Sequence, residues 1–550
     1  PFDAAIKGAS EIGFTIISIT VSLVAVFIPV LFMGGLVGRL FSEFAITISV
    51  AILASGFVSL TLTPMLCSKW LRGHTATAPT ARGSKLEAAY GWMLSRYTTS
   101  LRWALARQRM MLMVTLATLV ASVGAFILAP KGFFPLEDVG FVFASTEGAQ
   151  DISFEAMVEK QKRVAEIIRA DPAVDKVFYA VGGARGAFNS GRLFFGLKPR
   201  GERESIFKVI QRLRKSLSAV EGINTYMQPL QNIQLGGRQS KSIYQYTLQG
   251  TNLPELYAWS DKMLSALQAN RNFQDVTSDL QIKSLQASVV VDQQKAASVG
   301  ISYDDIRQAL YAAFGESQVA SLYKPSNDYA VILEVAPEFQ QRPEDIGKLY
   351  VRSRSNPDRI VPLESVATIE RGLAALVVNH QGQLPAVTIS YNLAPGVSLS
   401  TATADLKALE QKLVLPSSIT ANSQGSAAAF ADSARGQGLL ILTALVVIYI
   451  ILGMLYESFI HPITILSGLP SAGLGAILIL MLFGMDLSII AIVGIILLIG
   501  IVKKNALMMV DFAISERHRG VSAEDAIYRA CILRFRPIMM TTLCAIFGTL

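Results

Sequence analysis

Residues 492–510 read IVGIILLIGIVKKNALMMV, and they place Lys503 and Lys504 side by side in an otherwise apolar run. A run of this length can cross a bilayer as a helix. An ammonium group near the middle of a membrane costs at least about 2.5 kcal/mol, so it is tolerated mainly where it has a partner. The pair therefore indicates a buried charge relay, and the apolar sequence that resumes at residues 506–510 favours this interpretation. The alternative is snorkelling, in which the span ends near Ile501 and both lysines reach the water interface.

Further uncharged, mostly apolar runs lie elsewhere along the chain. Each approaches or reaches the roughly 20 residues that a helix needs to cross the hydrocarbon core, except the last. That run starts near Pro537 and is too short to span before the sequence ends at Leu550. The sequence therefore predicts a multi-pass membrane protein. The longer runs occupy residues 14–33, 44–68, 110–130, 438–456, 462–485 and 487–502.

The composition agrees with a chain that is part membrane-embedded and part water-soluble. Of its 550 residues, 51% are hydrophobic, which is too many for an ordinary soluble protein, while 16% are charged, which is too many for a fully embedded one. The net charge of +8 is spread along the chain, and many basic residues collect beside apolar runs. This distribution fits membrane topology and argues against a nucleic-acid partner.

The positions of Lys and Arg predict the side of the membrane on which each connecting segment lies. Residues 69–109 contain eight basic residues and one acid, Glu87, which is typical of a cytoplasmic segment. Counting the spans alternately from there, the arginine-rich segment from residue 515 onward is cytoplasmic as well. The same count places residues 131–437 on the opposite, external side of the membrane.

The external segment has the pattern of an α/β domain. Short runs with strand-like alternation are separated by longer runs with helical periodicity, in a repeated β-α-β order. This order predicts a layer of βαβ units with helices on one face. The first unit has strands at residues 139–145, 174–181, 192–197 and 223–228 and helices at 154–170 and 205–220. The second is expected from a strand starting at Tyr244, a helix at 253–268, and segments at 376–391 and 398–413.

An insert of residues 286–369 separates the halves of the second unit, with short helices and a hairpin predicted around residues 325–328. Such an insert is best explained as a docking module, the alternative being a long surface excursion. The expected fold class is a membrane α-helical bundle plus an α/β (α+β) external domain of ferredoxin-like βαβ units with an inserted docking subdomain. The expected domains are residues 1–130 and 437–550 for the bundle, 131–243 for the first unit, 244–285 with 370–436 for the second, and 286–369 for the insert.

The sequence carries none of the usual signals of an enzyme or a metalloprotein. Cys67, Cys531 and Cys544 lie in or beside apolar runs without metal-ligand spacing, and the four histidines are scattered singly. No GxxxxGK[ST] phosphate loop occurs, which argues against an ATP-driven transporter. We therefore expect no cofactor, no metal site and no catalytic residues.

Five segments carry a more specific pattern: KGFFPLED at residues 131–138, NIQLGGRQSKSIYQYTLQG at 232–250, VDQQKAASVGIS at 291–302, GIVKKNALMMVDFA at 500–513 and RFRPIMMTT at 534–542. With the order of the spans, they resemble the resistance-nodulation-division (RND) multidrug efflux pumps of Gram-negative bacteria over essentially the whole chain. The double lysine and IYQYTLQG are most like the Mdt/Mux branch, whose pumps combine two kinds of subunit. The resemblance implies a fragment that runs from transmembrane helix 5 to part of helix 11.

The resemblance implies a proton relay in the membrane. In the family, a lysine on helix ten and an arginine and a threonine on helix eleven work with two aspartates on helix four, and the motif selects Lys504, directly before Asn505, together with Arg534 and Thr541. Arg534 and Thr541 are about two turns apart, so they share a helix face. Lys503 points about 100° away from Lys504, toward a neighbouring helix, lipid headgroups or a water-filled cavity. The alternative is that Lys504 and Arg534 are paired residues that hold the bundle together.

The resemblance also implies drug-binding surfaces between the external subdomains. The matching positions are Phe178, Phe194, Tyr244, Tyr246 and Leu248. The last three alternate along one strand and share a face, and aromatic and aliphatic contacts suit greasy substrates of varied structure. The alternative is that these residues are ordinary core residues of a βαβ layer. Where relatives carry a phenylalanine-rich loop, residues 181–191 read VGGARGAFNSG, with Phe188 as the one aromatic residue.

The function implied by the resemblance is drug/proton antiport, driven by the proton motive force, of amphiphilic or hydrophobic compounds. The chain would be a secondary active transporter of the bacterial inner membrane, with a large periplasmic domain. Its implied partners are small amphiphilic substrates, other RND subunits in a homo- or hetero-trimer, a periplasmic adaptor protein and an outer-membrane channel. The alternatives are an RND exporter of another cargo, such as metal ions or lipids, and a non-transporting membrane receptor.

Overall fold

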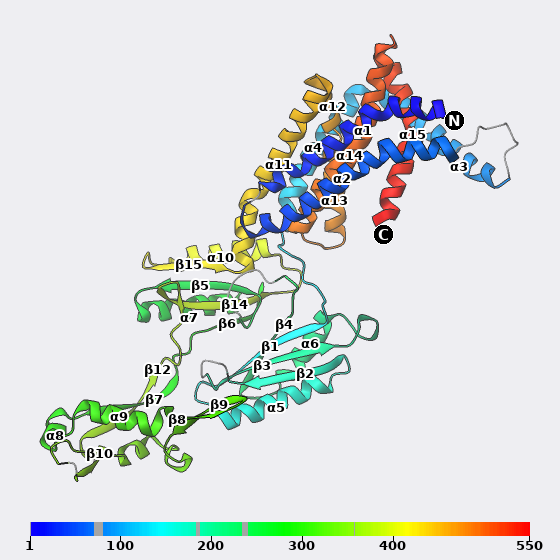
Figure 1. Ribbon diagram of the computed structural model, residues 1–550. Coiled ribbons are helices and arrows are strands. Elements are labelled where there is room, and N and C mark those ends of the chain that lie inside the picture. The colour runs from blue at the N-terminus through cyan, green and yellow to red at the C-terminus, as the bar shows by residue number, and fades with distance from the viewer. Residues whose placement is uncertain are drawn as a thin grey trace.

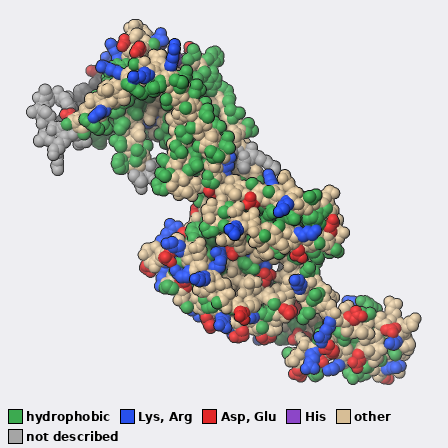
Figure 2. All heavy atoms as spheres, turned by 180° about the vertical axis from the view of Figure 1, so that it is seen from behind, with side chains coloured by type: hydrophobic (Ala, Val, Ile, Leu, Met, Phe, Trp, Pro, Cys, Tyr) green, Lys and Arg blue, Asp and Glu red, His purple; other side chains and the backbone are tan. Residues whose placement is uncertain are grey.

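The computed structural model describes residues 2–32, 34–70, 81–182, 187–233, 240–356 and 358–549. The molecule is elongated, with a helical bundle at one end, two sheets in the middle and the insert at the far end (Figure 1). Figure 2 shows hydrophobic side chains gathered on the bundle and charged side chains over the rest, with Lys and Arg also gathered at the end of the bundle away from the sheets. An apolar outer surface of this kind is what a lipid-facing bundle requires.

Seven helical stretches in the described part of the chain are long and apolar enough to cross a membrane. The multi-pass helical bundle expected from the sequence is therefore present. Its helices are α1 (Phe2–Leu31), α2 (Gly35–Trp70), α4 (Gln108–Leu128), α11 (Ser426–Tyr456), α12 (Ile460–Leu466) with α13 (Leu469–Leu482), α14 (Ile489–His518) and α15 (Ala523–Thr549). The more polar α3 (Ala81–Leu105) packs against α15.

Two spans differ from the sequence expectation. The run at residues 462–485 is divided into α12 and α13, because Pro470 has no backbone N–H to bond to Leu466 and continue the helix. The last span does not start near Pro537; it belongs to a helix that begins at Ala523, so the prediction of a segment too short to cross is wrong for this helix. The arginines before Pro537 do not end the helix, because arginine is a good helix former.

The first sheet has the strand order β2-β3-β1-β4, with antiparallel neighbours, and lies farther from the bundle than the second sheet (Figure 1). Two amphipathic helices, α5 and α6, place apolar residues three or four apart in one core against the sheet. The predicted elements of this unit are all present, with bounds shifted by at most three residues. They are β1 (Phe141–Gly148), α5 (Phe154–Ala170), β2 (Val174–Val181), β3 (Ser190–Leu197), α6 (Ile206–Leu217) and β4 (Ile223–Pro229).

The second sheet has the order β13-β14-β5-β15, with β6 also paired to β14. The strand expected from residue 376 begins only at Leu384, because the chain first turns at Gly382, which has φ +62°. β6 and β15 were not predicted, since both are short and mostly polar. The elements are β5 (Tyr244–Gly250), α7 (Leu253–Ala269), β6 (Phe273–Ser278), β13 (His380–Gln381), β14 (Leu384–Leu393), α10 (Leu399–Leu413) and β15 (Ile419–Gln424).

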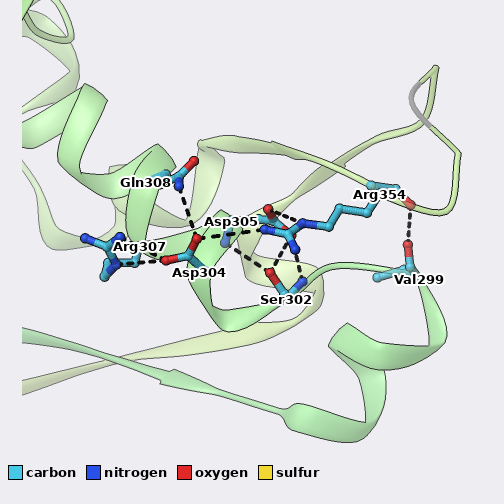
Figure 3. A network of polar contacts seen from close by, with 8 residues as sticks. Val299, Ser302, Asp304, Asp305, Arg307, Gln308 and Arg354 are labelled. Atoms are coloured by element: carbon cyan, nitrogen blue, oxygen red, sulfur yellow. Dashed lines mark hydrogen bonds and ion pairs between the residues drawn. The ribbon is translucent and has the colours of Figure 1, made fainter.

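The insert is carried on a two-stranded ribbon, β7 (Ser284–Val291) with β12 (Ala367–Ala374). The hairpin expected around residues 325–328 is confirmed as β8 (Ser317–Lys324) and β9 (Asn327–Leu333). Figure 3 shows the polar network at the start of α9, where Ser302 and Asp305 form a reciprocal cap and Arg354 donates to Asp305 at 2.8 Å. The remaining elements are α8 (Gln293–Ser298), α9 (Tyr303–Phe314), β10 (Tyr350–Arg352) and β11 (Ile360–Pro362).

The bundle is joined to the second sheet through the segment that follows α4. The backbone N–H of Leu487 donates to Pro130 at 2.8 Å, and that of Ile489 donates to Phe133 at 3.2 Å. Phe133 is 5% exposed and packs in one cluster with Val37 and Ile489 of the bundle and with Leu399 and Phe430. The first residues of α14 are thus held against the segment that follows α4 and against the second sheet unit.

Candidate functional site

The two adjacent lysines of α14 lie in different surroundings. Lys503 is 1% exposed, and its Nζ donates a hydrogen bond to the backbone oxygen of Ser22 on α1 at 2.6 Å. Lys504 is half-buried and makes no hydrogen bond or ion pair with any described residue. Since α14 continues to His518, neither lysine stands at the end of the helix. The sequence leaves three environments open for the Lys503 side chain. In the structure this side chain points to a neighbouring helix, α1.

The predicted relay residues lie on neighbouring antiparallel helices, but the structure does not join them. The guanidinium of Arg534 lies over the Phe512 ring, 5.1 Å from its centroid, and its Nε is buried without an acceptor among the described residues. The hydroxyl of Thr541 donates to the backbone of Ile538 in its own helix. No hydrogen bond or ion pair connects Lys504, Arg534 and Thr541 in the described part of the chain. The relay therefore remains a prediction.

A row of hydroxyl residues on α1, which the sequence reasoning missed, faces α14. Thr15, Ser18 and Ser22 are all buried and are spaced three and four residues apart, so they occupy one face of the helix. The Thr15 hydroxyl donates to the carboxylate of Asp511 on α14. The signal was present in the sequence as hydroxyl residues at helical spacing within an apolar run.

A cavity of about 530 Å³ lies where the two sheets meet the bundle. Its wall includes Phe134 and Leu136 from the segment after α4, Tyr244 from β5, and Asp486 from the turn before α14. Gly132 allows this close approach, because a Cβ atom there would lie 2.8 Å from Asp486. The lining is mainly apolar with a few polar groups, as is common in sites for small organic molecules.

Burial shapes the electrostatics of this cavity. Loss of solvent raises the pKa of the Asp486 carboxyl above its usual range. Burial, assisted by the charge of Asp486, raises the pKa of Tyr244 to about 12, so the tyrosine remains a neutral hydroxyl. The cavity therefore combines a mainly apolar wall with one acid, Asp486, and one base, Arg214.

The five predicted substrate-binding residues divide between the two sheets: Tyr244, Tyr246 and Leu248 pack at the core of the second sheet, and Phe178 and Phe194 lie on the first. Tyr244 lines the cavity. Tyr246 and Leu248 are buried in the core of the second sheet, where the Tyr246 hydroxyl donates to the carboxylate of Glu410. Phe178 and Phe194 are opposite each other on β2 and β3, and they are 65% and 41% exposed. The structure therefore brings together the three residues that alternate along β5, of which Tyr244 lines the cavity, but it does not join them to Phe178 and Phe194.

The loop expected to replace a phenylalanine-rich segment is described only in part, because residues 183–186 lie outside the described ranges. Phe188 packs edge-on against Phe154 at the start of α5, with ring centroids 5.7 Å apart. The ring thus packs on the first sheet unit, and Phe188 is not among the residues that line the cavity.

An ion-pair network connects the two sheets beside the cavity. Arg214 of α6, a cavity-lining residue, donates to Asp275 of β6 at 2.6 Å. Asn392 of β14 donates to the same carboxylate oxygen at 2.9 Å. Nearby, Lys241 pairs with Glu147 of β1 at 2.7 Å. These contacts set the spacing between the sheets on one side of the cavity.

The comparison with known families gives a match over this architecture. The sequence model of the AcrB/AcrD/AcrF family matches residues 1–550. The match spans the bundle, both sheets and the insert, so all of the elements described above belong to one family pattern.

Proposed function

The chain belongs to the AcrB/AcrD/AcrF family of RND transporters, and we propose that it exports amphiphilic or hydrophobic compounds in exchange for protons. One observation carries the proposal: α14 connects the two features that such a transporter needs. The residues just before the helix, Asp486 and Ser488, line the cavity, and the same helix carries Lys503 and Lys504 farther along. A change in charge state at the lysines therefore has a rigid route to the cavity.

The proposed coupling step is an electrostatic switch at Lys504. Its ammonium is half-buried and free of partners among the described residues, so it is available to pair with carboxylates that the family resemblance assigns to transmembrane helix 4. Protonation of such a carboxylate weakens the pair, and the helices then repack. Arg534 and Thr541 are proposed as the other members of this relay.

The proposed substrates are compounds with an apolar body and, in some cases, a positive charge. Tyr244 and Asp486 line the cavity, while Phe178 and Phe194 offer an exposed aromatic surface on the first sheet. Aromatic faces and aliphatic walls are weakly directional, which permits substrates of different shapes. For Tyr246 and Leu248 we propose that they hold β5 in position and do not contact the substrate, because both are buried in the core of the second sheet.

The proposed setting is the inner membrane of a Gram-negative bacterium, with residues 131–437 in the periplasm. We propose that the sheets are ferredoxin-like porter subdomains, that residues 286–369 are a docking subdomain, and that the chain acts in a trimer with a periplasmic adaptor and an outer-membrane channel. Assignment to the Mdt/Mux branch, with its two kinds of subunit, rests on the double lysine and the segment IYQYTLQG.

The function is tested by Lys504→Ala in the complete transporter, expressed in a strain whose other exporters have been deleted. We expect resistance to amphiphilic compounds to fall to the level of the empty strain at equal expression, because the switch has lost its cation. The matched control is Lys7→Ala, which removes an exposed lysine at the start of α1. Full resistance in Lys504→Ala would refute the coupling step. No resistance to any amphiphile in the wild type, with transport of metal ions or lipids instead, would refute the substrate class.

A further inference from the structure

Helices α1 and α14 form an antiparallel pair with polar groups along its contact line. Lys503 lies opposite Ser22 and Asp511 lies opposite Thr15, with Ser18 between the two contacts on α1. The distance along α14 from Lys503 to Asp511 is about 12 Å at the rise of an α-helix. The polar row therefore leads from the interior of the bundle toward the end at which α14 finishes.

The Lys503 ammonium has more donors than partners. It carries three N–H groups, and among the described residues it has one acceptor, the backbone oxygen of Ser22. The Ser22 hydroxyl is used within its own helix, on Ile19, whereas the Ser18 hydroxyl is fully buried and has no partner among the described residues. Two unused ammonium donors and one unused hydroxyl thus share a buried helix interface.

The surroundings of this row are otherwise apolar and tightly packed. Gly500 lies so close to α1 that a Cβ atom there would be 2.7 Å from Leu23. Of the other helices that pack on α14, α13 has no charged residue, and α12 has only His461, whose ring meets that of Tyr456. α15 contributes Cys531 beside Met509 and Arg534 over Phe512; its other charged residues are Glu524, Asp525, Arg529 and Arg536.

One further titratable group stands near the Asp511 end of the row. The hydroxyl of Tyr456 on α11 is buried and has no hydrogen-bond partner among the described residues. The ring of Phe14, next to Thr15, packs edge-on against Tyr456. Helix α11 therefore closes this end of the row with a group that can donate or accept a hydrogen bond.

We propose that the interface between α1 and α14 is a second proton pathway, in which Lys503 is the carrier and Asp511 is the acceptor toward the cytoplasm. This inference rests on the proposed proton-coupled function and adds a site to it. The Lys503 ammonium releases one proton and becomes a neutral amine. The hydroxyls of Ser18 and Thr15, with water between them, pass the proton on, and the Asp511 carboxylate takes it up and later releases it. A proton from the other side of the membrane restores the ammonium, so one proton crosses in each cycle.

A purely structural role explains Lys503 poorly. A buried ammonium without a carboxylate partner lowers stability, and an apolar side chain of the same length would fill the same space without that cost. Arginine separates the two roles. It keeps a positive charge and N–H donors for Ser22, but it does not lose its proton in proteins, so it cannot act as a carrier.

The test uses the complete transporter in proteoliposomes with a pH-sensitive dye inside, and it records proton flux and substrate transport between pH 5.5 and 8.5. For Lys503→Met and Lys503→Arg we expect the proton flux per substrate to fall to the share carried by the relay at Lys504, because neither methionine nor arginine can release and regain a proton at this position. Thr15→Val removes the hydroxyl next to Asp511 and is expected to slow the flux. The matched control is Thr20→Val, at a residue on another face of α1. The Thr20 hydroxyl donates to the backbone oxygen of Ile16 in its own helix. This variant is expected to leave the flux unchanged.

The outcomes separate this inference from the function on which it depends. A wild-type transporter whose substrate transport ignores the pH gradient refutes proton coupling as a whole. In a second outcome, wild-type transport is coupled to protons, and Lys503→Arg has the proton flux and pH profile of the wild type. Lys503 would then have a structural role, and the second pathway alone would be refuted. Loss of flux in Lys503→Met and Lys503→Arg, with normal expression and thermal unfolding, supports it.

Discussion

At the scale of single residues, side-chain direction decides what a charge can do. Lys503 and Lys504 have the same chemistry and adjacent positions, but a helix turns by about 100° for each residue. One ammonium is therefore buried against α1, while the other is half-buried and available for a different partner. Two adjacent lysines in the sequence thus form two distinct sites in the structure.

Asp138 shows how a carboxylate is fixed at the entry to the first sheet. Arg203 donates to both of its oxygens, at 2.6 and 2.9 Å, and the backbone N–H of Ile206 donates to it at 2.9 Å. The hydrogen bonds from Arg203 lower the pKa of Asp138 from 3.8 to about 2.

This shift makes a prediction about pH. Because the folded pKa lies below the unfolded one, the stabilisation by Asp138 is fully present above pH 3.8 and is lost as the pH falls toward 2. Asp138→Asn is therefore expected to lower the free energy of unfolding at pH 7, with a difference from wild type that shrinks below pH 4. Thermal unfolding measured from pH 7 to pH 2.5 checks this. A difference that stays constant over the whole range would contradict it.

At the scale of elements, α14 connects the bundle to the segment that leads into the sheets. Ser488 caps its first turn by accepting from the N–H of Ala491, and the segment after α4 hydrogen-bonds to the residues around this cap. The helix then continues without a break through both lysines to His518. A displacement of either end of α14 therefore moves the other end, because the helix is continuous.

Phe133 is predicted to hold this connection together. Phe133→Ala is expected to destabilise the protein by about 3–5 kcal/mol, because it leaves a cavity in the cluster that contains Ile489 and Leu399. The control is Phe141→Ala, since Phe141 is largely exposed. The measurement is thermal unfolding of both variants in detergent. An equal unfolding midpoint for Phe133→Ala and wild type would show that this cluster does not hold the two parts together.

At the scale of the whole molecule, the spacing of the two sheets controls the cavity beside them. Arg214 and Asp275 connect α6 to β6 across this boundary, and Arg214 also lines the cavity. Asp275 has φ +50°, a backbone conformation that asparagine also tolerates. Asp275→Asn thus removes the charge and keeps the backbone.

Asp275→Asn is predicted to let the sheets separate more easily. Spin labels at Lys208 on α6 and Asp261 on α7, both exposed, report the distance between the two units. We expect a broader distance distribution shifted to longer values, and a changed rate of substrate export. Distributions that coincide for variant and wild type would mean that other contacts, such as Lys241 with Glu147, are sufficient to fix the sheets.

Much of the architecture was predictable from local pattern alone. Hydrophobic run length indicated the membrane helices, and alternation and periodicity indicated the first sheet unit, because these signals depend on neighbours along the chain. Among the exceptions were β6 and β15, which are short and polar and become strands only by pairing with β14 and β5. The last helix was shortened in the prediction because its arginines were taken to interrupt the span.

The sequence by itself determined that this chain crosses a membrane several times, that it carries an α/β domain between two groups of helices, and that charges lie inside an apolar helix. These properties follow from composition and spacing. Only the tertiary structure decided that Lys503 meets α1, that Tyr246 and Leu248 lie in a core while Tyr244 faces a cavity, and that Thr15 meets Asp511. The physical reason is that the partners of these side chains come from helices and strands that are hundreds of residues away in the sequence. The local sequence pattern does not determine how those elements pack.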